Sequence, residues 1–362
     1  MSQAEQKALD PYEARLAALE QRLLAIEAGR GGARPAVAAV QPGRRSVTAQ
    51  AERFGLIGAW IVLVIIFGAV IPDSFLSWLN FSTMFSSQAV LVVLTLGLLI
   101  PLTAGDFDLS VASTLVLSAM SIAVLNAHHG WGVVPAVAVA IGCGALIGLI
   151  NGAIVLYFRI HSLIVTLGVG TFINGIILWI SGSQTIAGVN FGLVNYVIVT
   201  RVFGISLSFY YALFLCLLMW YCFEYTTIGR RLLFVGRGRE VARLSGIRVD
   251  RVRLVGFVLS GTIGACAGVL YAGMTGSADP LSGLALLLPA FAAAFLGATS
   301  IVPGRFNPWG SFIGVYFLVT GITGLTMLGV DTLVQNLFYG GGLVLAVALS
   351  QLVRRRQPQN FS

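Results

Sequence analysis

Ten apolar runs, each about the length of a membrane-spanning helix, constrain most strongly what this chain can fold into. The first is Gly55 to Ile71, and the others lie at about 87–104, 109–126, 133–157, 162–181, 206–223, 254–275, 284–302, 309–328 and 332–352. A helix of about 20 apolar residues crosses the bilayer with its backbone hydrogen bonds satisfied internally. Charged residues make up only 10% of the 362 residues, against about 25% in soluble domains. The sequence therefore predicts an all-α polytopic membrane protein with about ten transmembrane helices and argues against a water-soluble enzyme.

The basic residues predict the orientation of these helices. Cytoplasmic loops carry an excess of Lys and Arg. With ten spans and a cytoplasmic N-terminus, 21 of the 22 basic residues fall on the cytoplasmic side, and only Arg201 lies outside. The cytoplasmic set comprises eight residues before position 54, Arg159, eight arginines between 230 and 253, Arg305 and the run 354–356. We therefore expect both termini to be cytoplasmic.

The first 53 residues contain no apolar core of the kind found in a cleavable signal peptide, so we expect the first span to direct insertion. Within this cytoplasmic extension we predict an amphipathic helix over residues 10–28, begun by Asp10, and a flexible tether over residues 29–50. Apolar residues recur in the helix with heptad spacing, which fits a parallel dimer seam. A helix that lies on the membrane surface or against another partner is the alternative. The ten-span transmembrane body then covers residues 54–353, and residues 354–362 form a basic cytoplasmic tail.

Several catalytic chemistries have no counterpart in the sequence. Lys7 is the only lysine, so a phosphate-binding Walker A loop, which needs a lysine, is impossible. The four cysteines lie in apolar runs without metal-ligand spacing and are interpreted as small buried hydrophobic residues. We expect no catalytic residues, no metal, no cofactor bound by this chain and no nucleic-acid partner.

Two carboxylates stand in a very short connection between the second and third spans. The segment Gly105-Asp-Phe-Asp-Leu-Ser110 leaves almost no room for a solvated loop. An ionisable residue at membrane depth is costly unless it faces a cavity or a partner. We predict either that Asp106 and Asp108 line a transmembrane pathway in a re-entrant element or that Asp108 caps the next helix. The two roles are compatible.

Other polar residues interrupt the apolar runs. A second junction, Gly304-Arg-Phe-Asn-Pro-Trp-Gly310, aligns Asn307 with Asp108 and suggests either a weak same-sense repeat or a chance similarity of two turns. Asn151 and Asn174 lie within spans, where an amide either bonds a neighbouring helix or contacts a polar solute. Small residues at every fourth position predict close helix packing; they are Gly144, Gly148 and Gly152, and Ser260, Gly264 and Gly268.

The longest internal cytoplasmic loop, residues 225–253, carries eight arginines. We predict a short helix over Arg239 to Leu244, closed by Gly246, that presents Val241, Ala242 and Leu244 beside basic residues. An exposed apolar edge on such a helix favours a protein partner. Binding of the arginines to an anionic membrane surface is the alternative.

Four segments in the same order resemble the ribose-type permease subunits of bacterial ATP-binding-cassette (ABC) sugar importers. They are Gly105–Ser110, Ile164-Val-Thr-Leu-Gly168, Thr227–Arg230 continuing to Glu240–Ile247, and Gly304–Gly310. The resemblance covers roughly residues 60–352. Three departures leave the substrate open: Ala104 replaces a glycine, His161-Ser162 replaces a Pro or Ala pair, and Asn174 stands where the family commonly has Arg.

The resemblance implies a permease of the bacterial inner membrane that moves a monosaccharide or related polyol. It further implies cytoplasmic ATPase subunits that use ATP and Mg²⁺, a periplasmic solute-binding protein, and a second permease copy or a paralogue within the lipid bilayer. The residues assigned to ATPase coupling are Arg239, Glu240, Val241, Ala242, Leu244, Gly246 and Ile247. The candidates for the pathway are Asp106, Asp108, Ser110, Asn151, Thr166, Asn174 and Asn307. A branched-chain amino-acid permease and a proton-coupled transporter that uses Asp106 and Asp108 are the alternatives.

Overall fold

The computed structural model describes residues 21, 42–331, 333–334, 337–342 and 344 of the chain. The expected helix 10–28 apart from residue 21, the first part of the expected tether, most of the apolar run 332–352 and the basic tail lie outside these residues. The chain divides into two units, Met1–Gln50 and Ala51–Ser362. The fold below is that of the second unit, together with the helix that leads into it.

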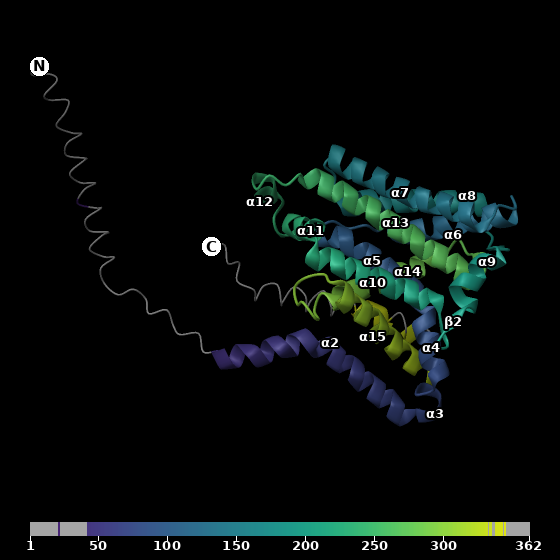
Figure 1. The fold of residues 1–362 in the computed structure, drawn as a ribbon, viewed down its shortest axis with the longest axis horizontal. Coiled ribbons are helices and arrows are strands. Elements are labelled where there is room, and N and C mark those ends of the chain that lie inside the picture. The colour runs from purple at the N-terminus through teal and green to yellow at the C-terminus, as the bar shows by residue number, and fades with distance from the viewer. Residues whose placement is uncertain (1–20, 22–41, 332, 335–336, 343, 345–362) are drawn as a thin grey trace, which may run out of the picture. The chain divides into compact units, whose positions relative to one another are not determined.

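Helices account for most of the described chain (Figure 1). The α-helices are α2 (Pro42–Val70), α3 (Pro72–Phe75), α4 (Trp78–Ser87), α5 (Ala89–Thr103), α6 (Val111–Ala127), α7 (Val133–Tyr157), α8 (Ser162–Ser181), α9 (Phe191–Val194), α10 (Leu207–Tyr225), α11 (Thr227–Arg237), α12 (Arg239–Leu244), α13 (Val249–Thr275), α14 (Ser282–Gly297) and α15 (Pro308–Met327). A π-helical turn, η1 (Asn195–Val199), follows α9. Two antiparallel pairs complete the fold, β1 (Ile186–Ala187) with β4 (Ser277–Ala278) and β2 (Arg201–Val202) with β3 (Ile205–Ser206).

Among the described residues, six helices are long and apolar enough to cross a membrane, namely the Arg53–Val70 part of α2, α7, α8, α10, α13 and α15. Helices α4 and α5 together form a seventh candidate, bent by 41°. Helices α6 and α14, with 17 and 16 residues, are apolar but shorter. The predicted polytopic all-helical membrane architecture is confirmed, while the number of ten spans stays a prediction.

Helix α2 begins earlier than the sequence analysis expected. It starts at Pro42, so residues 42–50, which we had assigned to a flexible tether, are helical. Proline suits the first position of a helix because its missing N–H has no intrahelical partner there. A helix already nucleated by an apolar span then extends at little cost through the good helix formers Ala49, Gln50, Ala51 and Glu52.

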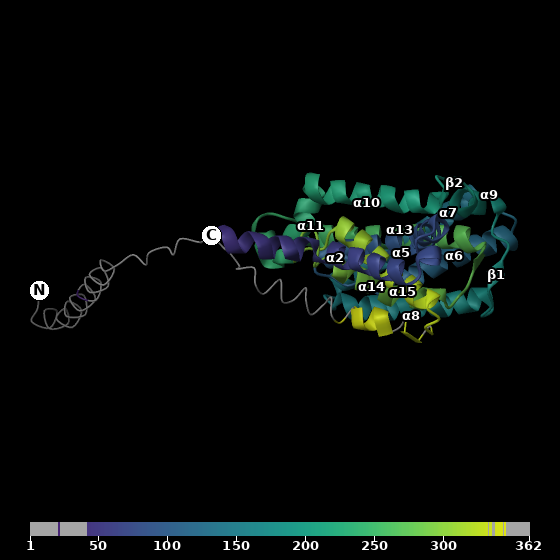
Figure 2. The same cartoon turned by 90° about the horizontal axis from the view of Figure 1, so that it is seen from below.

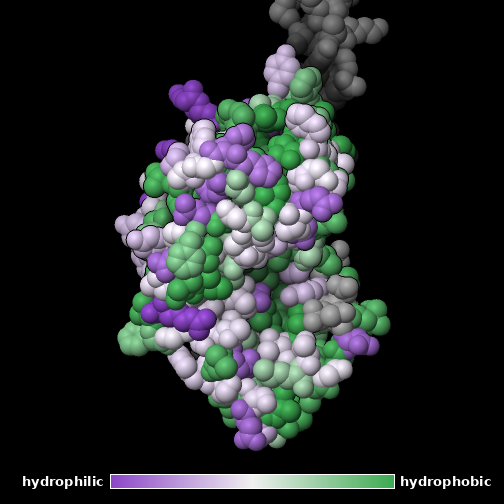
Figure 3. Space-filling model, turned by 90° about the vertical axis from the view of Figure 1, so that its right-hand side faces the viewer, coloured by the Kyte–Doolittle hydropathy of each residue, from purple (hydrophilic) through white to green (hydrophobic). Residues whose placement is uncertain are grey.

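The connections gather at two opposite ends of the helix bundle. Figures 1 and 2 show α11 at one end and α9 and β2 at the other. The turn after α5 lies at the α11 end, since Gly236 packs against the backbone of Thr103. The junction before α15 lies there too, because Arg305 forms an ion pair with Glu224 at 3.1 Å. Figure 3 looks onto the opposite end, whose surface mixes polar and apolar side chains.

Helix α13 packs directly against α7 and α6 through glycines. A side chain at Gly148 of α7 would collide with the backbone of Phe257, and Gly144 meets Gly261 in the same way. On another face of α13, Gly268 lies against the carbonyl of Leu115 in α6. The predicted role of these small residues in close packing is confirmed. The four cysteines are unpaired and buried or half-buried, as expected.

Candidate functional site

The turn between α5 and α6 is held from outside by the first residues of α8. Gly105, with a φ of +77°, ends α5 in the left-handed conformation that glycine adopts freely. The backbone amide of Phe107 then donates to the hydroxyl of Ser162 at 3.0 Å, and that of Leu109 donates to the hydroxyl of Thr166 at 3.0 Å. These bonds satisfy two buried backbone donors that neither helix could serve.

Asp106 joins this turn to the segment that follows α10. Its side chain is almost fully buried, and its two oxygens accept hydrogen bonds of 2.7 Å each from Nε and Nη2 of Arg253. Arg239, the first residue of α12, donates to the same carboxylate at 2.9 Å and to the carbonyl of Gly105 at 2.9 Å. One buried carboxylate thus connects the predicted coupling helix, the start of α13 and the end of α5.

Asp108 lies deeper and belongs to a separate network of neutral groups. Its carboxylate accepts from the hydroxyl of Ser110 at 2.7 Å, from the Ser110 amide at 3.1 Å and from the hydroxyl of Ser260 at 2.7 Å. Among the described residues it forms no ion pair. Burial raises the pKa of the Asp108 carboxyl, and the bonds from the two serines lower it in part.

Asn151 extends this network onto α7. Its amide group donates to the hydroxyl of Ser110 at 2.7 Å, and its carbonyl oxygen is buried without a hydrogen-bond partner among the described residues. The structure therefore brings five of the seven predicted pathway residues into one contiguous region. They are Asp106, Asp108, Ser110, Asn151 and Thr166.

Two predicted pathway residues lie elsewhere. Asn307 is buried at the start of α15, where it accepts from the amide of Gly310 at 2.7 Å and donates to the carbonyl of Gly297 at 3.0 Å. It therefore caps a helix and ties down its own turn. Asn174 is half-buried on α8 and makes no hydrogen bond within the described part of the chain.

Asp108 makes the contact expected of an N-terminal cap. The residue directly before α6 is Ser110, which makes no side-chain capping bond of its own. The Asp108 carboxylate accepts from the backbone amide of Ser110, two residues further on, at 3.1 Å, and from the hydroxyl of Ser260 on α13 at 2.7 Å. The capping contact therefore coexists with a position among buried polar side chains.

The two glycine turns resemble each other in geometry as well as in sequence. Gly304 has a φ of +82°, close to that of Gly105, and both turns lie at the α11 end of the bundle. A proline stands inside the preceding helix in both cases, Pro101 in α5 and Pro289 in α14. These features favour the repeat hypothesis over a chance similarity.

Residues 225–253 form helices rather than an open loop. Helix α12 covers Arg239–Leu244, and Gly246 follows it with a φ of +80°, so the predicted short helix and its end are confirmed. Val241 and Leu244, three positions apart on one face, are 47% and 88% exposed. Ile247 is half-buried against the core.

Ala242 does not belong to the predicted exposed edge. It is fully buried. Leu244 is two positions further along, which places the two side chains on opposite sides of a helix with 3.6 residues per turn. Glu240 is exposed and pairs with Arg243 at 3.3 Å. The surface open to a partner therefore consists of Val241 and Leu244 with charged neighbours.

Three residues that contribute to the site were missed in the sequence. Arg253 was counted only as one positive charge of the loop, and Ser260 only as a small packing residue. Ser162 was noted only as a departure from the family pattern. No spacing links them to Asp106 or Asp108, because each contact joins segments more than 50 residues apart.

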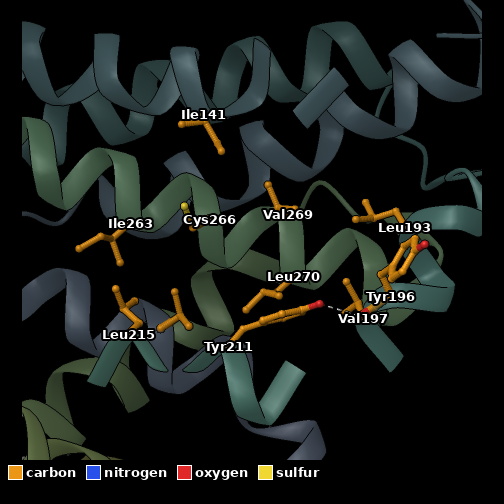
Figure 4. A pocket seen from close by; sticks show the side chains of 11 residues that line it. Ile141, Leu193, Tyr196, Val197, Tyr211, Leu215, Ile263, Cys266, Val269 and Leu270 are labelled. Atoms are coloured by element: carbon orange, nitrogen blue, oxygen red, sulfur yellow. Dashed lines mark hydrogen bonds between the residues drawn. The ribbon is translucent and has the colours of Figure 1, made fainter. Parts of the chain in front are cut away.

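A cavity of about 330 Å³ lies between α10, α13 and η1 (Figure 4). Its lining is Val93, Ile141, Leu193, Tyr196, Val197, Tyr211, Leu215, Ile263, Cys266, Val269 and Leu270. The hydroxyl of Tyr211 already donates to the carbonyl of Tyr196 at 3.2 Å. Since a sugar needs several hydrogen-bonding partners, this apolar cavity is not assigned to the pathway.

Comparison with known protein families identifies the family to which this chain belongs. The family described as branched-chain amino acid transport system / permease component matches residues 80–347. The chain belongs to this family. It is a multi-pass protein of the bacterial inner membrane. No solved structure matches it.

Characterised relatives of this permease are named for sugars and for autoinducer 2. The D-allose transport system permease protein AlsC of Escherichia coli K12 is 32% identical over 84% of this chain and 93% of its own length. The autoinducer 2 import system permease protein LsrC of Enterobacter sp. 638 is 29% identical over 83% of this chain and 89% of its own. The galactose/methyl galactoside import permease protein MglC of Salmonella typhimurium LT2 is 29% identical over 83% and 95%.

These comparisons confirm the predicted resemblance to permease subunits of ABC sugar importers. The relatives are transport permease subunits. The amino-acid alternative is not favoured, although the family description names that class of solute.

Proposed function

We propose that this chain is the permease subunit of an ABC importer that moves a monosaccharide or related polyol across the inner membrane. The observation that carries the proposal is the similarity to AlsC and MglC, which extends over more than 80% of both chains in each comparison. Both relatives are named for sugars. Because the similarity spans the whole helical body rather than one motif, it includes the elements that would form the pathway.

The membrane topology we propose has ten spans and both termini in the cytoplasm. Helices α6 and α14 are short, but each connects the α11 end of the bundle with the opposite end, as the longer helices do. Arg305 and the arginines of α11 and α12 lie at that end, whereas Arg201 lies in β2 at the opposite end. This distribution supports a cytoplasmic α11 end.

Reporter fusions test this topology. Alkaline phosphatase is active only outside the cytoplasm, so fusions after Gly130 and Gly329 should be active and a fusion after Gly238 inactive. The reverse pattern would overturn the orientation, and an active fusion after both Gly130 and Gly238 would overturn the span count.

The partners we propose occupy the two ends of the bundle. Cytoplasmic ATPase subunits, which bind ATP and Mg²⁺, dock on the exposed face of α12 formed by Val241 and Leu244. A periplasmic binding protein delivers the solute to the opposite end. A second copy of the permease, or a paralogue, completes the transporter in the bilayer, and this chain itself performs no hydrolysis.

Asp106 supports a direct mechanical route from the ATPase to the interior. Movement of α12 would pull on Arg239, and the ion pair would transfer that movement to the turn before α6. The same turn is bonded to Ser162 and Thr166 of α8. The buried polar residues around Asp108 would therefore shift together as the ATPase subunits close.

Reconstitution into proteoliposomes with the co-purifying ATPase and a binding protein tests the function. Labelled D-allose and galactose should enter only when ATP is supplied, and a protonophore should leave the uptake unchanged. Labelled leucine serves as the matched solute control. Uptake of leucine but of neither sugar would move the chain to the amino-acid class. Uptake without ATP that a protonophore abolishes would identify a secondary transporter.

A further inference from the structure

A hollow beside the coupling helix is bordered by three arginines that have no acidic partner among the described residues. It has a volume of about 460 Å³ and is lined by Arg231, Ser245, Gly246, Ile247, Arg248, Arg251 and Val252. Arg231 belongs to α11, Arg248 to the segment after α12, and Arg251 to the first turns of α13. All three are exposed.

Three other arginines of residues 225–253 have acidic partners. Arg239 and Arg253 pair with Asp106, and Arg243 pairs with Glu240 and Asp250. Three positive charges therefore converge on one hollow while the acids available in this segment serve other arginines. Such a concentration of unpaired guanidinium groups favours an anionic ligand with planar or tetrahedral oxygens.

An apolar stripe leads from the hollow along the spanning helix. Arg251, Val255 and Leu259 follow one another at four-residue intervals and so share one face of α13. Val255 is 50% exposed and Leu259 is 39% exposed. Since α13 is a candidate membrane span, these side chains are available to acyl chains. Positive charge at one end of an exposed apolar stripe complements a phospholipid, which has an anionic headgroup and apolar acyl chains.

We propose that this hollow binds the phosphate of an anionic phospholipid, with its acyl chains along Val255 and Leu259. Basic pockets at the cytoplasmic ends of spanning helices suit such headgroups. An acidic protein segment would satisfy the arginines but would make no use of the apolar stripe. Leu244, the exposed apolar side chain on which we propose that the ATPase docks, belongs to α12 and does not line the hollow.

Native mass spectrometry of the intact permease–ATPase complex tests this site. The complex is transferred to a neutral detergent and titrated with phosphatidylglycerol or phosphatidylcholine of equal chain length. Wild type should retain phosphatidylglycerol preferentially. Arg248→Gln combined with Arg251→Gln should weaken that retention about 30-fold, from the contribution of two basic residues at an anionic surface. Arg237→Gln, which removes an exposed charge outside the hollow, is the matched control and should leave it unchanged.

Three results would overturn the proposal. One is equal retention of the two lipids by wild type, and a second is unchanged phosphatidylglycerol retention in the double variant. The third is displacement of the lipid by millimolar inorganic phosphate, which would assign the hollow to a soluble anion. The second result, if accompanied by loss of the ATPase subunits, would assign the arginines to the protein interface instead. Lipid retention is read directly, so the result does not depend on which solute the transporter carries.

Discussion

Asp106 and Arg253 form a bidentate ion pair in the interior, with both hydrogen bonds at 2.7 Å, although 147 positions separate them in the chain. Arg239 of the coupling helix shares the same carboxylate. Asp106 therefore has two functions in the fold: it neutralises the largely buried Arg253, and through Arg239 it fixes α12 to the turn before α6.

Replacing Asp106 by Asn should strongly destabilise the permease. The change would leave the charge of Arg253, which is largely buried, without a counter-ion, a situation that costs about 3 kcal/mol or more. Thermal unfolding of the purified protein in detergent measures the loss. Asp250→Asn is the control: Asp250 lies on the same helix as Arg253 but is exposed, so the change should alter the midpoint little. Equal midpoints for the two variants would contradict the assigned role of the buried pair.

The same substitution at Asp108 should have the opposite outcome. Asp108 has no ion-pair partner among the described residues, and the hydroxyl of Ser260 can turn from donating a hydrogen bond to accepting one from the new amide. We expect Asp108→Asn to keep or raise the unfolding midpoint at neutral pH, because no buried charge remains to be desolvated. A fall as large as that of Asp106→Asn would refute this.

The pH dependence of stability follows from the raised pKa of Asp108. Burial raises this pKa above the ordinary value of 3.8, so the folded protein holds the proton more tightly than the unfolded chain does. Its stability should therefore fall as the pH increases from about 3.8 through the raised pKa. Unfolding midpoints across this range should decline less in Asp108→Asn than in wild type. The exposed Asp73→Asn variant should behave like wild type.

Docking on α12 can be separated from folding of the segment around it. Leu244→Arg places a charge on the exposed face and should abolish co-purification of the ATPase and uptake, while the permease remains inserted. Leu281→Arg, an equivalent change at an exposed leucine of the opposite end, should keep the ATPase bound. Retention of the ATPase by Leu244→Arg would remove α12 from the interface. Ala242→Asp, which puts a charge at a buried position, should instead lower the unfolding midpoint.

Close packing between α7 and α13 can be tested with two glycine-to-valine variants that differ in the space available at the substituted position. Gly148→Val would push a side chain into the backbone of Phe257 and should destabilise the protein by about 1–3 kcal/mol. Gly142→Val lies on the same helix, where nothing lies within 4 Å of the added Cβ. Thermal unfolding should rank the two variants clearly, and similar midpoints would contradict the observed helix contact.

Local patterns accounted for the long apolar helices of this protein and for α12. The apolar runs predict the helical membrane architecture because a backbone in lipid must satisfy its own hydrogen bonds. The glycine at position 246 ends α12 where the sequence indicates, and the small residues of α7 and α13 meet as expected. These features depend on residues a few positions apart, so they can be predicted from one sequence.

The partners of the polar residues depended on the tertiary structure. Nothing near Asp106 in the sequence indicates Arg253, and nothing near Asp108 indicates Ser260, since the contacts form only when α13 packs beside the turn. For the same reason, Ala242 looked available on a short basic helix and became buried once α12 folded against its neighbours. The sequence alone determined which side chains must avoid lipid. Only the packing of helices that are far apart in the chain decided which of these side chains meet, because no sequence spacing relates residues so distant from one another.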